Sequence, residues 1–468
     1  MSGQEKTREK SGGRGIQWKK GLCGVCPAGC WVEVGLRDGI LVDIRRDPDH
    51  TLGTICRRGE HAPEIVYSEH RLRHPMRRVG PKGSFDFRRI SWDEAYEAIA
   101  AELYRIKEES GPEAVCIYTG RGAQEQSLCD MYQPRGVVVS SASNVLFPYG
   151  SPNTTGVGAL CYVSLHMIAP HVTMGRMQTD MFVDIDNAEM AVMWGTNPAT
   201  DSPPVDMERL EKAARRGVDI VAIDPRRTEA ARRTGAQWVP VRPGTDGALA
   251  LSMIQVLVEE DLYDIEFAEN WCHGFDELVT YANHFRPEAA EAVTGVPAGV
   301  TRDLARRICR ANGASFLMYT GLEYSNSGVQ SARAVLTLFA LADQLDVPGG
   351  IGLAMLGDVF PVNRSSNLEN PDLGLAIGRD EFPVYSHYRG ESHAIALAGS
   401  VLRGEPYRVR GLIIEGSSLL TSWPQTPLWR ETLSRLDFLA CIDRQLTADA
   451  AYADIILPAT TMFENLSY

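Results

Sequence analysis

The sequence predicts an α/β protein in which a small N-terminal cysteine domain precedes two α/β lobes. At 468 residues, the chain exceeds the roughly 250 to 300 residues at which a single hydrophobic core stops growing, so several domains are expected. Short apolar runs that end in glycine alternate with helical patterns, which is typical of mainly parallel sheets covered by helices. Four cysteines between Cys23 and Cys56 indicate a separate, metal-dependent unit at the N-terminus.

These four cysteines follow the pattern C-x2-C-x3-C, then a gap of 25 residues, then a final cysteine. A four-iron cluster takes one thiolate per iron, and a tight loop of cysteines with one distant cysteine suits that geometry. Structural zinc is the competing interpretation, but zinc sites usually show two C-x2-4-C pairs and Cys56 stands alone. We therefore predict a 4Fe–4S cluster. Arg57 and Arg58 follow the last cysteine, and by themselves they indicate only a solvated loop.

Composition excludes several classes of function. The net charge of −13 argues against a nucleic-acid partner, which would require a basic surface. The longest apolar run, at 248–258, contains Ser252 and Gln255 and ends in acidic residues, so no segment is expected to span a bilayer. The first 20 residues show neither an apolar signal core nor a twin-arginine pair, which predicts a cytoplasmic protein. The other six cysteines are scattered singly, as in a reduced protein without a disulfide framework.

The first lobe begins after a basic connector. Ser91 and Glu94 form a capping box, and apolar residues at helical spacing predict a helix from 91 to 110. The run AVCIYTG then predicts a buried strand. A glycine-rich polar loop, Gly150–Cys161, follows and carries a single cysteine. Taken alone, Cys161 is better explained as a small buried apolar residue than as a ligand.

A mononucleotide-binding unit comes next. The strand at 190–194 leads into a glycine turn, a helix from 203 to 216, and a second strand that ends in Asp224. Such a turn exposes backbone N–H groups to phosphate, and an acid at the next strand tip can accept from a ribose hydroxyl or a guanine edge. This is a Rossmann-like half. The fingerprint G-x-G-x-x-G is absent, so NAD is not indicated.

Further strand tips carry similar turns. The segment DPRRT begins at Asp224, and Gly244-Thr245-Asp246 would form a second nucleotide-contacting turn. Each of these motifs alone is equally well explained as ordinary turn chemistry. Later, GLIIEGSSLL predicts a strand and a turn at Gly416, and FLACID places Asp443 at another strand tip.

Taken together, the cysteine pattern through C-x-R-G, then W-G-x-N-P, D-P-R-x-T and P-G-T-D in this order, resembles the molybdopterin oxidoreductases of the dimethyl sulfoxide reductase family. The resemblance covers essentially the whole chain from Cys23 onward. It implies a molybdenum or tungsten bis(molybdopterin guanine dinucleotide) cofactor beside the 4Fe–4S cluster. Arg58 would lie between cluster and pterin and act in electron transfer. The cluster ligands would be Cys23, Cys26, Cys30 and Cys56.

The same resemblance assigns Cys161, which follows a similar S-P-N, as the thiolate ligand of the molybdenum or tungsten. Cys129 and Ser164 are the alternative candidates. The family carries G-x-N-P where Ser417 and Ser418 stand here, which weakens individual assignments to the second pterin nucleotide. The implied cofactor-binding residues are Gly195, Asn197, Asp224, Arg226, Gly244, Thr245, Asp246, Gly416 and Asp443.

The resemblance also implies the domain boundaries. A cluster domain would span 18–75, a discontinuous α/β lobe 76–156 and 346–468, and a Rossmann-like pterin-dinucleotide domain 157–345. The implied activity is two-electron oxygen- or sulfur-atom chemistry on a small substrate, of the thiosulfate, polysulfide or arsenate reductase type. Expected partners are a ferredoxin-like iron–sulfur subunit and a membrane anchor. The family continues beyond this chain's end, so a C-terminal portion is expected, either as a separate polypeptide or as sequence lost from this chain.

Two alternatives to this activity stay open. The segment LYDIEFAENWCHGFDEL is similar to acetylene hydratase, but Pro27 stands where that enzyme has an acid after its second cage cysteine. Non-redox hydration would require such an acid. The other alternative is a non-catalytic iron–sulfur relay subunit without the pterin. Cys161, Asp224 and the G-T-D turn argue against a relay, because a relay would need none of them.

Overall fold

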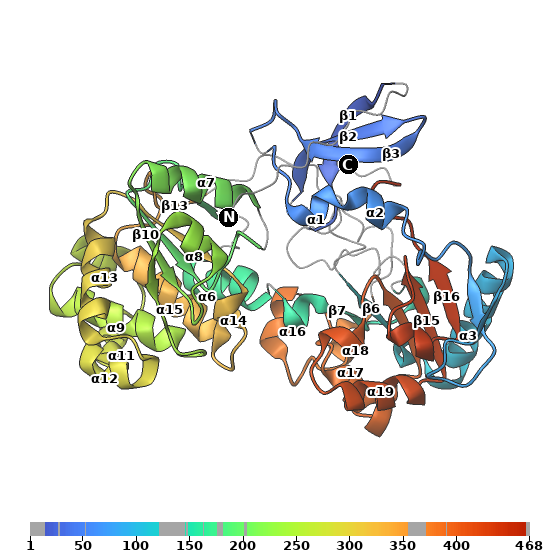
Figure 1. Ribbon diagram of the computed structural model, residues 1–468. Coiled ribbons are helices and arrows are strands. Elements are labelled where there is room, and N and C mark those ends of the chain that lie inside the picture. The colour runs from blue at the N-terminus through green and yellow to red at the C-terminus, as the bar shows by residue number, and fades with distance from the viewer. Residues whose placement is uncertain are drawn as a thin grey trace.

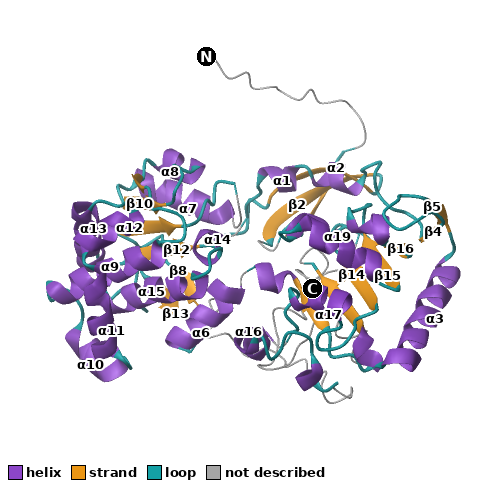
Figure 2. Cartoon of the chain, turned by 90° about the horizontal axis from the view of Figure 1, so that it is seen from below, coloured by secondary structure: helices purple, strands orange, loops and turns teal. Residues whose placement is uncertain are grey.

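Two lobes lie side by side, with a small antiparallel domain set against them, in the computed structural model of the protein (Figure 1). The structure describes residues 15–26, 29–51, 53–120, 146, 148–161, 163–175, 181–200, 204–353, 371–389 and 391–464. The view from below separates the same two lobes along the long axis of the molecule (Figure 2). Among the described helices, none combines the length and apolar character needed to cross a bilayer.

The cysteine domain is a three-stranded antiparallel sheet followed by two short helices. Its strands are β1 (Gln17–Cys23), β2 (Cys30–Arg37) and β3 (Ile40–Arg46), and its helices are α1 (Arg57–Glu60) and α2 (Ala62–Val66). Cys23 at the end of β1 pairs directly with Cys30 at the start of β2. The short connection between these strands therefore brings the first cysteines of the motif together.

One lobe, which we call the nucleotide lobe (residues 181–353), is built on a parallel sheet in the order β11-β10-β9-β12. The strands are β9 (Met190–Trp194), β10 (Asp219–Ile223), β11 (Gln237–Val239) and β12 (Ala314–Met318). A two-stranded sheet, β8 (Met181–Val183) with β13 (Ile351–Leu353), adjoins them. The helices are α7 (Pro204–Arg215), α8 (Glu229–Thr234), α9 (Asp246–Glu259), α10 (Ile265–Trp271), α11 (Phe275–Ala282), α12 (Pro287–Thr294), α13 (Ala298–Arg310), α14 (Thr320–Glu323) and α15 (Gly328–Leu341).

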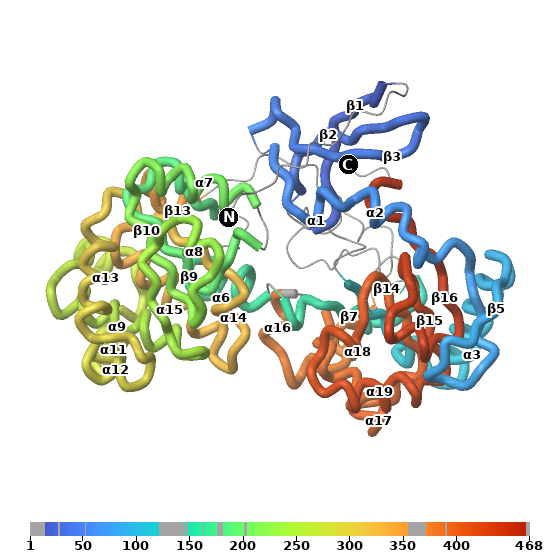
Figure 3. The backbone as a smooth tube through the Cα atoms, in the orientation of Figure 1, coloured from blue at the N-terminus to red at the C-terminus, as the bar shows by residue number. Residues whose placement is uncertain are grey.

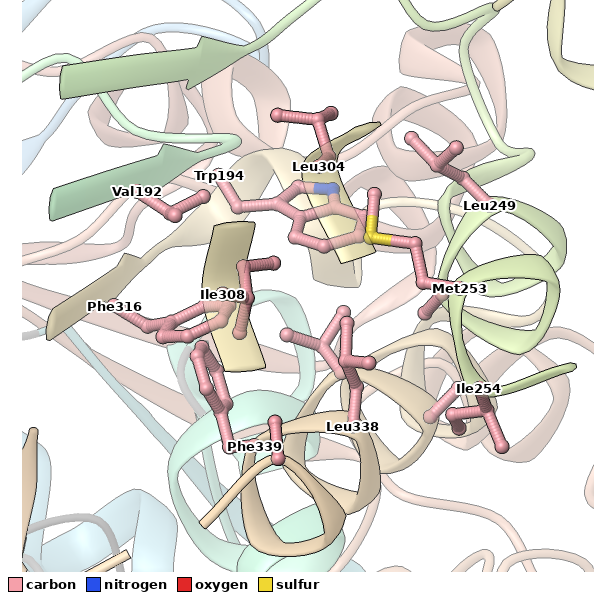
Figure 4. Packing of buried hydrophobic residues seen from close by; sticks show 14 of the residues in the cluster. Val192, Trp194, Leu249, Met253, Ile254, Leu304, Ile308, Phe316, Leu338 and Phe339 are labelled. Atoms are coloured by element: carbon pink, nitrogen blue, oxygen red, sulfur yellow. The ribbon is translucent and has the colours of Figure 1, made fainter. Parts of the chain in front are cut away.

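The core of the nucleotide lobe lies between its sheet and the helices α9, α13 and α15. Trp194 and Phe316 from the sheet pack with Met253 and Leu338 from the helices, and all four side chains are buried (Figure 4). Every residue of β9 and β12 is buried, as expected for parallel strands covered on both faces. This packing holds the carboxyl ends of the strands in a fixed arrangement.

The other lobe, which we call the split lobe, combines residues 76–156 with 371–464. Its seven-stranded sheet has the order β5-β4-β16-β15-β14-β6-β7. The strands are β4 (Met76–Arg78), β5 (Phe87–Arg89), β6 (Val115–Thr119), β7 (Thr154–Gly156), β14 (Gly411–Glu415), β15 (Phe438–Asp443) and β16 (Ile455–Pro458). The tube view shows the C-terminal strands, in red, beside N-terminal segments in blue (Figure 3).

The sheet of the split lobe is mixed. Strands β16, β15, β14, β6 and β7 run parallel, whereas β4 and β5 are antiparallel at one edge. The predicted α/β class with a lobe discontinuous in sequence is confirmed. The described helices here are α3 (Trp92–Ser110), α16 (Pro383–Arg389), α17 (Ala396–Arg403), α18 (Leu419–Ser422) and α19 (Thr426–Arg435). Helix α6 (Ala169–Met174) packs instead against α15 of the nucleotide lobe.

Local patterns account well for the individual elements. The predicted helix begins after Ser91, whose side chain accepts from the Glu94 amide while the Glu94 side chain accepts from the Ser91 amide. The segment Gly150–Cys161 differs from the predicted loop, because it contains strand β7 paired with β6. Ser151 explains this difference, since its hydroxyl donates to the Val115 carbonyl oxygen (2.7 Å) and aligns the segment with the sheet.

Candidate active site

The cysteine motif forms one cluster of thiols beside helix α1. Cys56 directly precedes α1, and Gly59 in that helix lies against Cys23. A Cβ atom added at Gly59 would come within 3.2 Å of the Cys23 sulfur and 2.9 Å of the Ile55 side chain. Glycine at this position of C-x-R-G therefore keeps the space beside the thiol open.

The electrostatics of the thiols show their mutual proximity. Burial raises the pKa of Cys30 to about 12, and the neighbouring thiols of the motif contribute to the rise. Burial likewise raises the pKa of Cys23, whereas the nearby Arg58 guanidinium opposes this by stabilising the thiolate. Within the described residues, no three histidine, cysteine or acidic side chains are close enough to hold one metal ion together.

A cavity of about 660 Å³ lies between the lobes, and Cys161 is part of its wall. The cysteine lies between a 3-10 turn at Val157–Leu160 and a π-helix at Val163–Ile168. π-helical turns are uncommon and occur frequently at functional sites. The side chain of Ser164 also lines the cavity, and its hydroxyl donates to the Glu323 carboxylate (2.8 Å).

The loop that carries Cys161 is anchored by Asn153, which is fully buried. The Asn153 side-chain amide donates to the Glu113 carbonyl oxygen (2.7 Å) and to the Tyr407 hydroxyl (3.0 Å). Its side-chain oxygen accepts from the Ile377 amide (3.0 Å). In addition, the Ser392 amide donates to the Thr154 carbonyl oxygen (2.9 Å). Asn153 thus connects the Cys161 loop with the segment that supplies another cavity wall.

That wall contains His393 within a group of aromatic rings. The imidazole stacks on Phe382, with ring centroids 4.2 Å apart, and meets the Tyr385 ring edge-on at 4.7 Å. All three residues line the cavity. Burial lowers the pKa of His393 to about 4, so the ring is neutral at pH 7.

Glu323, at the end of α14, lines the same cavity and is buried. The Ser164 hydroxyl (2.8 Å) and the Leu165 amide (3.3 Å) both donate to its Oε2 atom. These two bonds fix the Glu323 carboxyl group beside Ser164 in the cavity wall. The cavity therefore brings together a thiol, a buried carboxylate and a neutral imidazole.

The predicted nucleotide turns lie at the carboxyl ends of the parallel strands of the nucleotide lobe. Gly195 follows β9, has a φ of +63°, and lies so close to Gly321 after β12 that a Cβ would come within 2.9 Å of that backbone. Gly321 also donates its amide to the Gly195 carbonyl oxygen (3.0 Å). Asp224 follows β10, where burial raises the pKa of its carboxyl. This edge of a parallel sheet is where such folds bind nucleotides.

Several predicted contact residues also have internal partners. Asn197 donates to the Thr200 hydroxyl (2.7 Å) and accepts from the Ala230 amide (3.1 Å). Asp246 is buried and accepts from the Trp194 indole nitrogen (2.9 Å). The Thr245 hydroxyl donates to the Arg242 carbonyl oxygen (2.7 Å). These bonds fix the turns themselves, and contact with a cofactor stays a prediction for each residue.

Gly244 and Arg226 differ from these three. Gly244 has a φ of +79°, and the nearest atom to a Cβ added there would be 3.8 Å away. The Arg226 side chain is exposed, while its amide donates to Asp224 (2.8 Å). Both positions therefore leave backbone or charge open to a ligand at the sheet edge.

The split lobe repeats the arrangement at its own strand ends. Gly416 follows β14 with a φ of +56°, and a Cβ added at Gly120 after β6 would clash with the Gly416 carbonyl oxygen. Asp443 ends β15, accepts from the Arg444 amide (2.6 Å), and has a pKa raised by burial. The predicted residues thus form two sets, one at the carboxyl edge of each sheet.

Comparison with known proteins shows the family to which the chain belongs. Residues 71–467 match the model of the molybdopterin oxidoreductase family, and residues 16–68 match the model of the molybdopterin oxidoreductase Fe4S4 domain. The chain belongs to the molybdopterin oxidoreductase family. Its cofactors are accordingly a molybdenum or tungsten pterin and a 4Fe–4S cluster.

Individual relatives support this membership. The probable oxidoreductase YoaE of Bacillus subtilis is 28% identical over 96% of this chain and 63% of its own length. The thiosulfate reductase molybdopterin-containing subunit PhsA of Salmonella typhimurium is 27% identical over 95% of this chain and 58% of its own. Acetylene hydratase from Pelobacter acetylenicus superimposes with a TM-score of 0.82 at 26% identity, covering 94% of this chain and 63% of that structure. The chain spans about six-tenths of the length of these relatives.

The residues of this molybdopterin oxidoreductase fit both cofactors. The four thiols with the open space at Gly59 suit a cluster. The glycine turns at two sheet edges suit phosphate groups, and a soft thiol in the cavity wall suits molybdenum or tungsten. Of the alternative metal ligands, Ser164 hydrogen-bonds to Glu323, and Cys129 lies outside the described residues.

Sequence reasoning missed Glu323, His393 and Asn153 as parts of this site. Glu323 and His393 are far from Cys161 in the chain, and only the fold brings them to one cavity. Asn153 enters the sequence pattern only as part of S-P-N. The available signal was its side-chain amide, because an asparagine buried directly before a strand, here β7, needs internal hydrogen-bond partners.

Proposed function

We propose that this chain carries the catalytic centre of a bis-pterin oxidoreductase that transfers an oxygen or sulfur atom to or from a small substrate. Cys161 in the wall of the cavity between the lobes is the observation that carries the proposal. When bound, the cofactor would supply two-electron redox chemistry and atom transfer. Reduction of an oxide would follow the balance RO + 2 e⁻ + 2 H⁺ → R + H₂O, with single electrons arriving through the cluster.

The chain's own residues have separate roles in this proposal. Cys161 would ligate the metal, and the glycine turns after β9 and β14 would hold the two nucleotides. Arg58 would lie on the electron path beside the cluster, as its effect on Cys23 supports. The apolar cavity wall around Phe382 and Val384 would exclude water from the reacting atoms. Thiosulfate, polysulfide and arsenate reduction are the activities proposed from the sequence.

A Cys161→Ser substitution tests the assignment of the ligand. Because substitutions around a metal ligand already cost about 10- to 100-fold in affinity or activity, loss of the thiolate should lower turnover at least as much. The measurement is dye-linked turnover together with X-ray absorption at the metal, which should lose one sulfur neighbour. Cys272→Ser, the same change in the nucleotide lobe outside the cavity, is the matched control. An unchanged sulfur count in Cys161→Ser would assign the ligand elsewhere.

Hydration of an alkyne is the second candidate, and two observations favour it. The buried carboxylate of Glu323 shares the cavity with Cys161, which supplies an acid that the sequence lacks at Pro27. The structural similarity to acetylene hydratase adds support. Assays of acetylene hydration and of dye-linked reduction on the same preparation separate the candidates. Metal analysis also tests the relay alternative, because a bare relay would contain iron without molybdenum or tungsten.

A further inference from the structure

The cavity beside Cys161 is lined by both apolar and polar side chains. Much of its wall is apolar, with side chains that include Leu160, Val163, Ile168, Phe382 and Val384. Such a wall favours the apolar body of a ligand. His393 lies beside this apolar surface and can donate a hydrogen bond, as can several hydroxyl groups that also line the cavity. It differs from those hydroxyl groups in being a ring packed among aromatic side chains.

The imidazole of His393 is held in one orientation by contacts on several sides. One ring face stacks on Phe382, at 4.2 Å and 27°, and Tyr385 and Trp423 meet it edge-on, at 4.7 Å and 6.5 Å. The Ile395 amide donates to Nδ1 (3.3 Å). Because Nδ1 accepts, the neutral ring carries its proton on Nε2.

The charge of His393 follows from its surroundings. Burial lowers the pKa of its imidazole to about 4, and no charged neighbour adds to this effect. The titratable groups on the elements packed around it include Tyr385, His387 and Tyr388 of α16, Glu391, and Glu381 at the cavity wall. The Tyr385 hydroxyl and the Glu391 carboxylate lie 3.5 Å apart. His393 is thus an uncharged donor throughout the physiological pH range.

The backbone fixes His393 relative to Cys161. The neighbouring Ser392 donates its amide to the Thr154 carbonyl oxygen (2.9 Å), in the loop that leads to Cys161. Asn153 accepts from the Ile377 amide and so connects the same loop to the approach to α16. A donor held this way loses little entropy when a ligand binds, which is the condition for a preorganised site.

We propose that His393 is a substrate-binding residue whose Nε2–H donates to an oxygen of a small, uncharged molecule with a compact apolar body. The proposal rests on the proposed function, because it places the reacting atom near Cys161. An uncharged donor in an apolar wall compensates poorly for the desolvation of an oxyanion. We therefore expect alkyl S-oxides and N-oxides to bind better than thiosulfate or arsenate.

Two substitutions test the hydrogen-bond donor of His393 separately from the packing of its aromatic ring. His393→Phe keeps an aromatic ring for Phe382 and Tyr385 but loses the N–H, whereas His393→Gln keeps an N–H donor. His284→Phe, on an exposed part of the nucleotide lobe, is the matched control. His393→Met repeats the loss of the donor with a flexible apolar side chain, should the phenylalanine variant not fold.

The readout that does not depend on turnover is the dissociation constant of dimethyl sulfone, measured by calorimetry on the cofactor-loaded enzyme. Loss of one hydrogen bond should weaken binding about tenfold in His393→Phe and raise the KM for dimethyl sulfoxide similarly. His393→Gln should stay within about threefold of the wild type, as should His284→Phe. The wild-type dissociation constant should be constant between about pH 6 and 8, since His393 stays neutral there.

Three results would overturn the inference. They are equal binding of dimethyl sulfone by the wild type and His393→Phe, equally weak binding by His393→Phe and His393→Gln, and a higher kcat/KM for thiosulfate or arsenate than for dimethyl sulfoxide. If no acceptor is reduced while the binding pattern appears as expected, the proposed function fails and the binding role of His393 stands. If acceptors are reduced without that pattern, only the role of His393 fails.

Discussion

At the scale of single residues, Arg58 offers a direct test of the electron path. Its guanidinium lies near enough to oppose part of the rise that burial causes in the pKa of Cys23, and a positive charge likewise stabilises the reduced, more negative state of a cluster. Arg58→Ala should lower the cluster potential by roughly 50 to 100 mV, from Coulomb's law at an effective dielectric constant of about 20. Arg58→Lys should be milder, because it keeps the charge but loses the planar fork.

The neighbouring Arg57 provides the control for this prediction. Arg57→Ala removes the same charge from an exposed side chain one position away, whereas the charge that acts on the Cys23 thiol is that of Arg58. Its cluster potential should match that of the wild type. Spectroelectrochemical titration measures both variants, and equal potentials in Arg58→Ala and Arg57→Ala would contradict the assignment.

Site residues could be predicted from the sequence where the members of a motif lie close together along the chain. The cysteine motif could be interpreted because its members are close together and their chemistry is specific. The strand-tip residues Asp224 and Asp443 could also be located, because each ends a readable strand. His393 and Glu323 could not, since neither carries a local pattern and only tertiary packing brings them to the Cys161 cavity.

At the scale of elements, Asn153 connects strand β7, the Cys161 loop and the segment before α16. Asn153→Ala would leave the Ile377 amide and the Glu113 carbonyl oxygen without their partner. A buried polar group without a hydrogen-bond partner destabilises the native state by about 1 to 3 kcal/mol. The free energy of local unfolding of these segments should therefore fall by about 3 kcal/mol. Hydrogen exchange at 151–161 and 391–396 measures this, because a multidomain chain does not unfold in one step.

An exposed asparagine controls for the chemical change. Asn270 donates only to the Glu266 carbonyl oxygen of its own helix, α10, and Asn270→Ala should change local stability by no more than about 0.5 kcal/mol. Unaltered exchange at 151–161 in Asn153→Ala would show that the loop is held by other contacts.

Most elements were predictable because each has a local cause. The capping box of α3 and the apolar run of β9 lie where the pattern places them. Strand β7 was not predicted, because the glycine, serine, proline and asparagine directly before it favour a loop by propensity. Its pairing with β6 depends instead on the Ser151 and Asn153 bonds to residues about 40 positions earlier. Tertiary contacts overrode propensity there.

At the scale of the whole molecule, hydrogen bonds and ion pairs among the described residues connect the cysteine domain to both lobes. Thr54 donates to Glu208 in the nucleotide lobe (3.0 Å). Arg71 donates to the Val66 and Ala459 carbonyl oxygens and pairs with Glu464 (2.8 Å), which ties the end of the cysteine domain to the split lobe. The core of the cysteine domain is small and includes Cys23 and Cys30 themselves.

A domain with so small a core depends on its metal for stability. Cys26→Ala should therefore lose most of the bound iron and the visible absorbance, and limited proteolysis should then cut within residues 15–68 before it cuts either lobe. The lobes should persist, because the cores of their sheets contain no residue of the cysteine motif. Cys309→Ala, in α13 of the nucleotide lobe, is the matched control and should keep its iron. Unchanged iron content and spectrum in Cys26→Ala would refute the cluster assignment, whereas loss of iron with equal cleavage of all three parts would show that the lobes themselves depend on the cluster.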